Sequence, residues 1–396
     1  MHGILHLKPG KEKPVRHRHP WIFSGAIAKV EGSSQAGEMV QVRDAQGNFL
    51  AWGYYNPKSQ ICARLLEWDA GTAIDETWWQ VKLEQAIHRR QRLLQSSETN
   101  ALRLVNAEAD LLPGLIVDQY GDYVVLQALT AGVEMVKATV VAHLNDLLSP
   151  KGIYERSDLY FRRIEGLPVT DGVLSGEAPP ELVEIQVGGH GFWIDLRHGQ
   201  KTGFFLDQNR NRREVAEYAD GRNVLDCFCY TGGFGVLARA AGARSVVSLD
   251  SSAGALELLR KNFQLNSFST KENEMVRGDV FESLRRFRED GRKYDLIILD
   301  PPKLAPTKAH VGKARRAYKD LNLGAMNLLT RDGILATFSC SSGISPALFQ
   351  QIVAWASVDA GREIQILHRL SQGEDHPVRL AFPESEYLKG LVCRVL

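Results

Sequence analysis

Cysteine is scarce in this sequence of 396 residues, and the few cysteines are scattered rather than grouped. The five stand at Cys62, Cys227, Cys229, Cys340 and Cys393. An odd, dispersed set offers neither a disulfide framework nor the paired spacing of a zinc site. We therefore expect a reduced, cytoplasmic protein without a metal.

Long apolar runs are also missing. No stretch approaches the roughly 20 apolar residues that a membrane-spanning helix needs. The N-terminus, "MHGILHLKPGKEKP", has no apolar core and no small-residue cleavage site, so it does not resemble a secretory signal. We expect no membrane association.

An excess of charge of one sign is lacking as well, since the formal net charge is +1. Two local clusters are nevertheless basic. The first contains Lys8, Lys11, Lys13, Arg16 and Arg18, and the second contains Lys308, Lys313, Arg315, Arg316 and Lys319. Such runs are most often solvated faces, but they can also contact phosphates.

The length of the chain predicts two or three domains at about 150 residues each. Residues 1–70 show short alternating strands, including a turn at Asp44–Gly47, as in a small barrel. Residues 71–190 begin with a basic helical segment and continue as a small α+β unit, with a hairpin turning at Tyr120–Asp122. Residues 191–396 form the third predicted domain.

The third domain alternates short apolar strands with helical segments. "NVLDCF", "SVVSLD", "YDLIILD" and "GILATFSC" are predicted strands, with helical sequence between them. This rhythm is typical of an α/β fold with a doubly wound, mostly parallel sheet, in which ligands bind at the carboxyl ends of the strands.

The first of these strands runs into a glycine-rich turn, "LDCFCYTGGFG", and the second ends at Asp250. Such a turn brings backbone N–H groups close to a ligand, and an acid in the position of Asp250 can accept hydrogen bonds from ribose hydroxyls. The G-x-G-x-x-G pattern of dinucleotide enzymes is absent. The turn therefore indicates an adenosine-type cofactor, with a glycine turn that serves only packing as the alternative.

Two later strand ends carry acids that suit the same site. In "RGDVF", Asp279 can receive an adenine amino group while Val280 or Phe281 lies against the ring, although a solvated turn acid would look the same. In "LDPPK", Asp300 precedes two prolines that stiffen the exit of the strand. A rigid lip of this kind can hold a planar base, whereas a plain structural stop is the alternative.

Taken together, "VLDCFCYTGG", "SLDSS", "GDVF", "LDPPK" and "FSCSSG" resemble class I S-adenosylmethionine-dependent methyltransferases. With the flanking "RHPWIFSGAI", "HGQKTGFFLDQNRNR", "DHPV" and "YLKGLVCRVL", nearly the whole chain is similar to the bacterial ribosomal RNA large subunit methyltransferase I family. The resemblance implies an N-terminal PUA-like RNA-binding β-barrel, a small central α+β domain and a Rossmann-like methyltransferase domain. It also implies methylation of cytosine C5 in 23S ribosomal RNA.

The resemblance assigns roles to individual positions. The S-adenosyl-L-methionine site would comprise Asp207, Gln208, Arg210, Asp226, Phe228, Tyr230, Thr231, Gly232, Gly233, Asp250, Ser251, Asp279, Val280 and Asp300. RNA would be contacted by Lys11, Lys13, Arg16, Arg18, Lys303, Lys313, Arg315 and Arg316. The expected partner is 23S ribosomal RNA, and a homodimer is one oligomeric state compatible with the sequence.

Chemistry at cytosine C5 gives Cys340 a role. A thiolate that adds to C6 makes C5 nucleophilic, and loss of the C5 proton later expels the thiol. In the sheet order that the resemblance implies, the strands ending at Asp300 and Cys340 are neighbours, so both can face one base. We therefore expect Cys340 and Asp300 to be catalytic. His376, Glu384 and Asp300 are candidates for the base that removes the C5 proton.

Three alternatives stay open on the sequence. A single cysteine together with D-P-P also resembles RNA uracil-C5 methyltransferases. D-P-P occurs in exocyclic amino methyltransferases too, but Lys303 replaces their following aromatic residue and Cys340 would then have no role. The third alternative is a non-catalytic RNA-binding factor, which the intact Asp250, Asp300 and glycine turn argue against.

Overall fold

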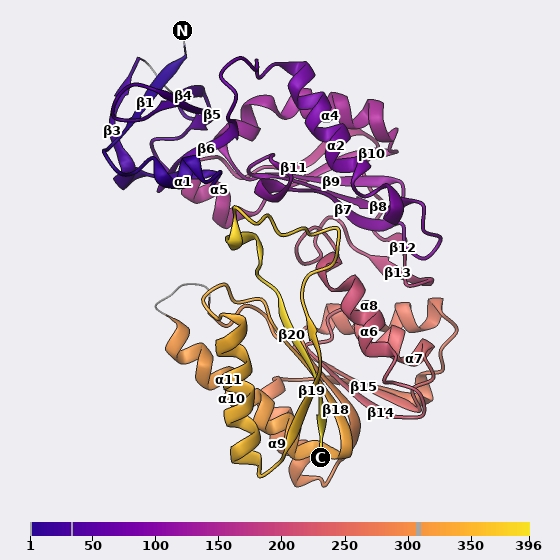
Figure 1. Cartoon of the computed structure of the whole chain (residues 1–396). Coiled ribbons are helices and arrows are strands. Elements are labelled where there is room, and N and C mark those ends of the chain that lie inside the picture. The colour runs from indigo at the N-terminus through magenta and orange to yellow at the C-terminus, as the bar shows by residue number, and fades with distance from the viewer. Residues whose placement is uncertain (1, 33–34, 306–309) are drawn as a thin grey trace. The chain divides into compact units, whose positions relative to one another are not determined.

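The computed structural model describes residues 2–32, 35–305 and 310–396, and Lys308 of the second basic cluster lies outside them. Contacts divide the chain into two compact units. Unit 1 comprises Met1–Ile185, Asp195–Phe205 and Asp375–Ser385. Unit 2 comprises Gln186–Ile194, Leu206–Glu374 and Glu386–Leu396. Each unit is described by itself below (Figure 1).

Unit 1 begins with a six-stranded sheet of order β2-β6-β5-β4-β1-β3. Its strands are β1 (Gly3–Leu7), β2 (Trp21–Phe23), β3 (Ile27–Glu31), β4 (Met39–Arg43), β5 (Phe49–Tyr55) and β6 (Ile61–Glu67). The predicted turn at Asp44–Gly47 joins β4 to β5. Val40 and Val42 alternate with polar neighbours, and both are buried in the core of this sheet.

A second sheet of unit 1 has five strands in the order β11-β10-β9-β8-β7. These are β7 (Ala101–Asn106), β8 (Leu115–Tyr120), β9 (Tyr123–Ala128), β10 (Gly152–Arg156) and β11 (Asp171–Gly176). The hairpin predicted at Tyr120–Asp122 is confirmed, since Tyr120 pairs with Tyr123. The helices of unit 1 are α1 (Lys13–Arg16), α2 (Glu76–His88), α3 (Gln91–Leu94), α4 (Ala131–Leu148) and α5 (Leu159–Glu165). Apolar side chains of α2 and α4 pack with those of β7–β10 into one core.

The chain then forms a hairpin of β12 (Val183–Val187) and β13 (His190–Ile194), and enters the seven-stranded sheet of unit 2. The order of this sheet is β16-β15-β14-β17-β18-β20-β19. Its strands are β14 (Asn223–Cys227), β15 (Ser245–Asp250), β16 (Asn273–Arg277), β17 (Tyr294–Leu299), β18 (Leu329–Ser339), β19 (Ile364–Leu370) and β20 (Lys389–Val395). Strands β14 to β18 pair in parallel, and only β20 runs antiparallel to its neighbours.

Helices cover both faces of this sheet, which confirms the predicted doubly wound α/β fold (Figure 1). They are α6 (Asn209–Ala216), α7 (Gly233–Ala240), α8 (Ala253–Leu265), α9 (Val280–Glu289), α10 (Val311–Leu328) and α11 (Pro346–Ala360). One face packs its apolar strand residues against α9, α10 and α11 in a single core. Across the described residues, no helix is long and apolar enough to cross a membrane.

Candidate active site

The strand ends that carry the predicted site residues lie in register at one edge of the seven-stranded sheet. Cys227 of β14 pairs with Leu249 of β15 on one side and with Leu299 of β17 on the other. The residues that follow, Phe228, Asp250 and Asp300, therefore emerge at the same level. Strands β17 and β18 are direct neighbours, as expected for the strands that end at Asp300 and Cys340.

The turn after β14 has an unusual backbone. Phe228 and Tyr230 adopt positive φ angles of 59° and 48°, and Gly232 has a φ of 87°. A β-carbon at Gly232 would lie 2.0 Å from the side chain of Leu259, so only glycine fits there. Left-handed backbone at non-glycine residues is strained, and such strain concentrates at ligand-binding turns.

Asp226 lies beneath this turn at the end of β14 and is almost completely buried. Its Oδ2 accepts a hydrogen bond of 2.9 Å from the backbone N–H of Gly235 at the start of α7. Burial raises the pKa of Asp226 to about 8. Its Oδ1 and the buried hydroxyl of Thr231 have no hydrogen-bond partner among the described residues.

Asp250 is held in place by the loops on either side of it. Its Oδ2 accepts the backbone N–H of Tyr230 at 2.9 Å, and its Oδ1 accepts that of Ser252 at 2.9 Å. These contacts tie the end of β15 to the glycine-rich turn. Asp279 has a local role as well, because its Oδ1 accepts the N–H of Glu282 at 3.0 Å and caps α9.

Asp300 stands at the end of β17, and its carboxylate accepts a hydrogen bond from Gln208 Nε2 at 3.0 Å. Burial, reinforced by the nearby charge of Asp207, raises the pKa of Asp300 to about 7. Asn211 donates in turn to Gln208 at 2.6 Å, which orients the amide. Segment 207–211 thus supports the carboxylate from the side of α6.

Asp207 and Arg210 differ in their surroundings. The Asp207 Oδ2 accepts the hydroxyl of Tyr387 at 2.7 Å, so it is tied to the loop before β20. The exposed Arg210 forms an ion pair of 2.6 Å with Glu214, one turn further along α6. Neither Tyr387 nor Asn211 was singled out from the sequence, because no motif marks them and their partners lie far away or in a helix of mixed composition.

The turn after β18 is anchored through the two serines that flank Cys340. The buried Ser339 hydroxyl donates to Tyr318 Oη at 2.9 Å, and Ser341 Oγ lies 3.0 Å from the same oxygen. Ser341 Oγ also accepts the backbone N–H of Ala305, three residues after the second proline of "LDPPK", at 3.0 Å. These bonds fix the backbone at Cys340, which itself is only partly buried. Tyr318 was also missed in the sequence, since it lies in the basic α10 segment.

The other four cysteines are all buried. Burial raises the pKa of Cys62, of Cys227 and of Cys229, and it raises the pKa of Cys393 to about 12. A thiol with a raised pKa is a poor source of thiolate. Cys340 is therefore the cysteine that is best placed to react.

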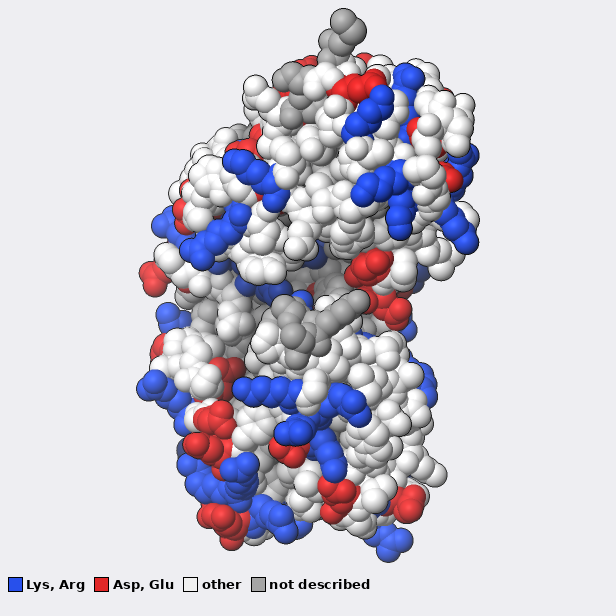
Figure 2. All heavy atoms as spheres, turned by 90° about the vertical axis from the view of Figure 1, so that its left-hand side faces the viewer, with Lys and Arg blue, Asp and Glu red and all other residues white. Residues whose placement is uncertain are grey.

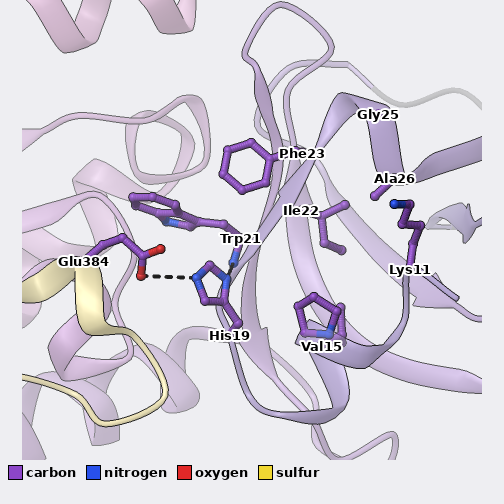
Figure 3. Close-up of a pocket in the computed structure, with 10 residues that line it drawn as sticks. Lys11, Val15, His19, Trp21, Ile22, Phe23, Gly25, Ala26 and Glu384 are labelled. Carbon is purple, nitrogen blue, oxygen red and sulfur yellow. Dashed lines mark hydrogen bonds and ion pairs between the residues drawn. The ribbon is translucent and has the colours of Figure 1, made fainter. Parts of the chain in front are cut away.

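The two other candidates for the proton-accepting base belong to unit 1. His376 is buried and its Nδ1 lies 3.0 Å from Asp375 Oδ1. Glu384 lies in a pocket of about 490 Å³, where its Oε2 is 3.3 Å from His19 Nε2. His19, Trp21, Phe23 and Lys11 line the same pocket (Figure 3).

Several predicted RNA-binding residues already have partners within unit 1 or unit 2. Arg16 forms an ion pair of 2.8 Å with Asp44, and the Arg18 guanidinium lies 5.3 Å from the centre of the Trp68 ring. On α10, Arg315 lies 5.1 Å from the ring centre of Trp355. Figure 2 shows basic side chains gathered over the region where Figure 1 places α10 and α11.

The donors and acceptors at this sheet edge fit an adenosyl cofactor. Asp250 faces the glycine-rich turn, the buried Asp226 and Thr231 carry polar atoms without a described partner, and the turn is shaped by glycine. Such an edge, at the carboxyl ends of parallel strands, is where doubly wound sheets bind nucleotides.

Comparison with known proteins agrees with this geometry. Residues 5–68 match a PUA-like domain, and residues 168–392 match the S-adenosylmethionine-dependent methyltransferase family. A protein named ribosomal RNA large subunit methyltransferase I, from Escherichia coli strain SMS-3-5, is 44% identical over 392 residues, which cover 99% of each chain. The chain belongs to the ribosomal RNA large subunit methyltransferase I family. This confirms the resemblance inferred from the motifs, and S-adenosyl-L-methionine is the cofactor of this family.

Other relatives of this family and fold extend the comparison. The protein of the same name from Shigella dysenteriae serotype 1 is 43% identical, over 99% of this chain and 98% of its own. A solved S-adenosylmethionine-dependent methyltransferase from Streptococcus mutans superposes over the whole length of both chains with a TM-score of 0.86 at 23% identity. A solved methyltransferase complexed with SAH superposes over both full lengths with a TM-score of 0.88 at 23% identity. These two structures share the fold.

Proposed function

We propose that this protein methylates C5 of a cytosine in 23S ribosomal RNA, with Cys340 as the nucleophile. Its relatives are named as methyltransferases of large-subunit ribosomal RNA, which supports the substrate class. The observation that carries the chemistry is the placement of Cys340. It is the least buried cysteine, on a turn fixed by Ser339 and Ser341, and it follows the strand next to the one that ends at Asp300.

S-adenosyl-L-methionine, when bound, supplies the electrophilic methyl group. The residues that would hold it are Asp250 at the ribose, Asp279 and Val280 at the adenine, and the glycine-rich turn with segment 207–210 at the methionine end. Asp226 supports the turn from below through the N–H of Gly235. Asp300 lies on the strand between those of the cofactor turn and Cys340.

Cys340 adds as a thiolate to C6 of the cytosine, which makes C5 nucleophilic enough to accept a methyl group. A base then takes the C5 proton, the C5–C6 double bond re-forms and the C6–S bond breaks. Among the three candidate bases we assign this step to Asp300. It shares unit 2 with Cys340, and a pKa of about 7 suits proton transfer near neutral pH.

Residues 1–70 and the basic side chains around them would hold the RNA. In this proposal Lys11, Lys13, Arg16 and Arg18 contact phosphates, and residues 71–190 connect this part to the methyltransferase domain at 191–396. Lys303, Lys313, Arg315 and Arg316 contact the RNA nearer the reacting base. Phosphate contacts of this kind make binding depend on salt.

The test is nucleoside mass spectrometry of undermodified 23S ribosomal RNA after incubation with S-adenosyl-L-methionine. We expect the wild-type protein to form 5-methylcytidine and Cys340→Ala to form none. Cys62→Ala, which removes a buried thiol of unit 1, serves as the matched control and should form the product. Binding of the cofactor to Cys340→Ala would show that the variant is folded.

Three other results would change the proposal. An N-methylated base, or 5-methylcytidine formed equally by Cys340→Ala, would refute the role of the thiol. Formation of 5-methyluridine that depends on Cys340 would support Cys340 as the nucleophile and would show that the methylated nucleobase is uracil instead of cytosine.

A further inference from the structure

Lys389 is a buried lysine whose position the proposed chemistry has not yet used. It is the first residue of β20 and pairs directly with Ser339, the last residue of β18. The residue as a whole is about 6% exposed. The Nζ atom donates a hydrogen bond of 2.8 Å to the backbone carbonyl of Ser341. Lys389 thus reaches across the strand end to the residue that follows Cys340.

A buried ammonium group normally needs a counter-ion. Lys389 forms no ion pair with a carboxylate in the part of the chain that the structure describes. Its ammonium has three donor hydrogens, and the Ser341 carbonyl takes one of them. The remaining hydrogens are free to point at a further acceptor beside the same turn.

The charges around Lys389 identify that acceptor. Burial lowers the pKa of Lys389 to about 8, and the strongest charge that opposes this shift is the one on Cys340. Glu386 acts in the same direction as Cys340 more weakly, and Lys303 acts against them. The thiol of Cys340 is therefore the titratable group most closely coupled to this amine.

We propose that the Lys389 amine, in its neutral form, takes the thiol proton of Cys340 and then, as an ammonium, holds the sulfur as a thiolate within an ammonium–thiolate pair. This inference rests on the proposed role of Cys340 as nucleophile. The S–H bond breaks, its proton moves to the amine nitrogen, and the sulfur keeps the electron pair with which it adds to C6. When the C5 proton leaves to Asp300, the C6–S bond breaks and the thiolate returns to its place beside the ammonium. The pair is regenerated without any further proton.

The experiment measures alkylation of Cys340 by iodoacetamide, followed by mass spectrometry of its peptide between pH 6 and pH 10. It needs neither RNA nor cofactor, so its result does not depend on methylation. We expect Lys389→Met to slow alkylation at pH 7.5 by about tenfold or more and to move the pH midpoint upward by about one unit. Lys389→Arg keeps a cation at the site and should retain most of the fast alkylation.

Lys293→Met is the matched control. Lys293 also donates to a backbone carbonyl, that of Asn327 at 2.9 Å, but it is exposed and precedes β17 at the opposite edge of the sheet. Its alkylation profile should equal that of the wild type. Equal profiles for Lys389→Met and the wild type would overturn the proposal. If Lys389→Met does not fold, a slow, high-pH alkylation profile in folded Lys389→Arg would overturn it equally.

The results also separate this inference from the proposed function. If Lys389→Met slows alkylation while Cys340→Ala still forms 5-methylcytidine, the pair exists but Cys340 is not the nucleophile. If Cys340→Ala forms no product and alkylation does not depend on Lys389, Cys340 is the nucleophile but Lys389 does not take its proton.

Discussion

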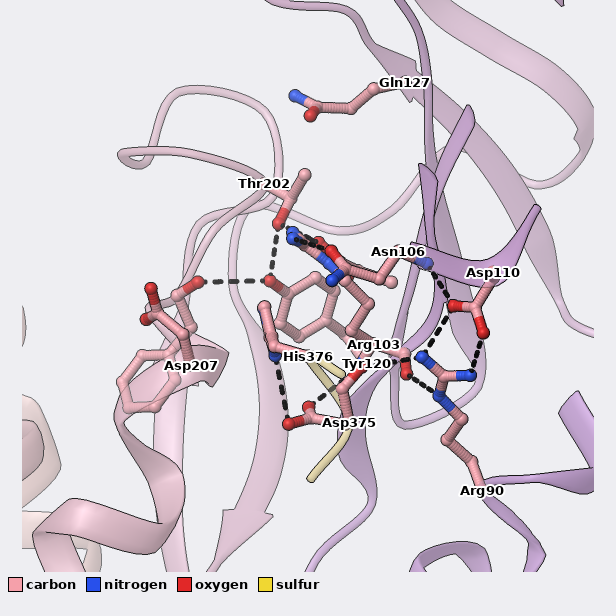
Figure 4. A network of polar contacts seen from close by, with 12 residues as sticks. Arg90, Arg103, Asn106, Asp110, Tyr120, Gln127, Thr202, Asp207, Asp375 and His376 are labelled. Atoms are coloured by element: carbon pink, nitrogen blue, oxygen red, sulfur yellow. Dashed lines mark hydrogen bonds and ion pairs between the residues drawn. The ribbon is translucent and has the colours of Figure 1, made fainter. Parts of the chain in front are cut away.

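Two sets of ionisable side chains in this molecule differ in how their charges are paired. In unit 1, Arg90 forms a two-pronged ion pair with Asp110, with both distances at 2.7 Å (Figure 4). Arg103 forms a similar pair with Asp118, at 2.7 and 2.9 Å. In unit 2, the buried Asp226 and the partly buried Asp300 stand at the sheet edge without an ion-pair partner among the residues that the structure describes, and burial raises their pKa values to about 8 and 7.

In the first cluster, Asp375 accepts hydrogen bonds from both arginines. The carbonyl of Asp375 accepts from Arg90 at 2.9 Å, and its carboxylate accepts the N–H of Arg103 at 3.0 Å. Burial alone would raise the pKa of Asp375, but His376 and the Arg103 N–H outweigh it, so the pKa lies below its usual value. Charges that are matched in this way stabilise one arrangement of the chain, whereas the unmatched carboxylates of unit 2 remain available for a ligand or a proton.

The largest effect should come from breaking the matched cluster. Asp110→Asn leaves the guanidinium of Arg90 buried without its carboxylate, and we expect the free energy of unfolding to fall by about 3–5 kcal/mol. Urea unfolding followed by tryptophan fluorescence measures this, because five of the seven tryptophans, Trp21, Trp52, Trp68, Trp78 and Trp79, lie in unit 1.

The control for that experiment is Asp122→Asn. Asp122 forms an exposed ion pair of 2.6 Å with Lys151, and exposed pairs contribute about 0–1 kcal/mol. A similar loss of stability in both variants would show that burial of the first cluster adds nothing.

The next effect concerns activity. Asp300→Asn keeps an acceptor for Gln208 but cannot accept the C5 proton, and we expect kcat to fall by about 10²-fold. In the wild type the rate should rise with pH through about 7, where Asp300 ionises, and this limb should be absent in the variant. Single-turnover methylation at several pH values measures both. A variant with full activity and an unchanged pH profile would assign the proton transfer elsewhere.

A smaller effect tests the raised pKa of Asp226. In the folded protein the Asp226 carboxyl group keeps its proton up to about pH 8, whereas in the unfolded chain it loses the proton near pH 4. The free energy of unfolding therefore falls as the pH rises between these two values. Asp226→Asn cannot ionise and still offers Gly235 an acceptor. We expect it to be more stable than the wild type at pH 8.5, by on the order of 2 kcal/mol, and equal to it below pH 4.

Thermal unfolding of the ligand-free protein across this pH range gives the comparison. The exposed Asp290, at the end of α9, provides the control variant Asp290→Asn, which removes a carboxyl group away from the site and is compared with the wild type at the same pH values. A pH-independent difference for Asp226→Asn would mean that Asp226 is ionised in the folded protein.

The smallest effect separates two roles of Asp279. Asp279→Ala loses the cap of α9 and should lower stability by about 1 kcal/mol. Asp279→Asn keeps a capping oxygen, so its stability should match the wild type while its affinity for the cofactor falls. Calorimetric titration with S-adenosylhomocysteine measures the affinity. Unchanged binding by Asp279→Asn would show that Asp279 only caps α9 and does not contact the cofactor.

The sequence predicted the elements whose signals are local. The strands of "NVLDCF", "SVVSLD" and "YDLIILD", the hairpin at Gly121 and the doubly wound sheet follow from short apolar runs and turn residues, and the structure confirms them. The alignment of Asp250 and Asp300 at one edge followed as well, because parallel strands bring their carboxyl ends together.

Contacts between distant positions had no such signal. Arg90 meets the carbonyl of Asp375, which lies 285 residues away in the sequence. Tyr318 bridges two serines from within a helix that the sequence marks only by its basic charge. Lys389 is an unremarkable residue of "YLKG" until β20 is placed beside β18. The chemistry-bearing motifs were therefore predictable, but their supporting partners were not.

The division of the chain has a consequence for the order in which the protein can fold during its synthesis. The chain passes between the units after Ile185, Ile194, Phe205, Glu374 and Ser385. Domains usually fold from the N-terminus as they are made. Here Arg90 cannot make its hydrogen bond to the carbonyl of Asp375 until that residue has been synthesised. The sheet of unit 2 likewise cannot be completed before β20, which lies between β18 and β19. Both units are thus completed by residues 375–396, and a chain that stops before residue 375 lacks both Lys389 and the contacts that Asp375 makes in unit 1.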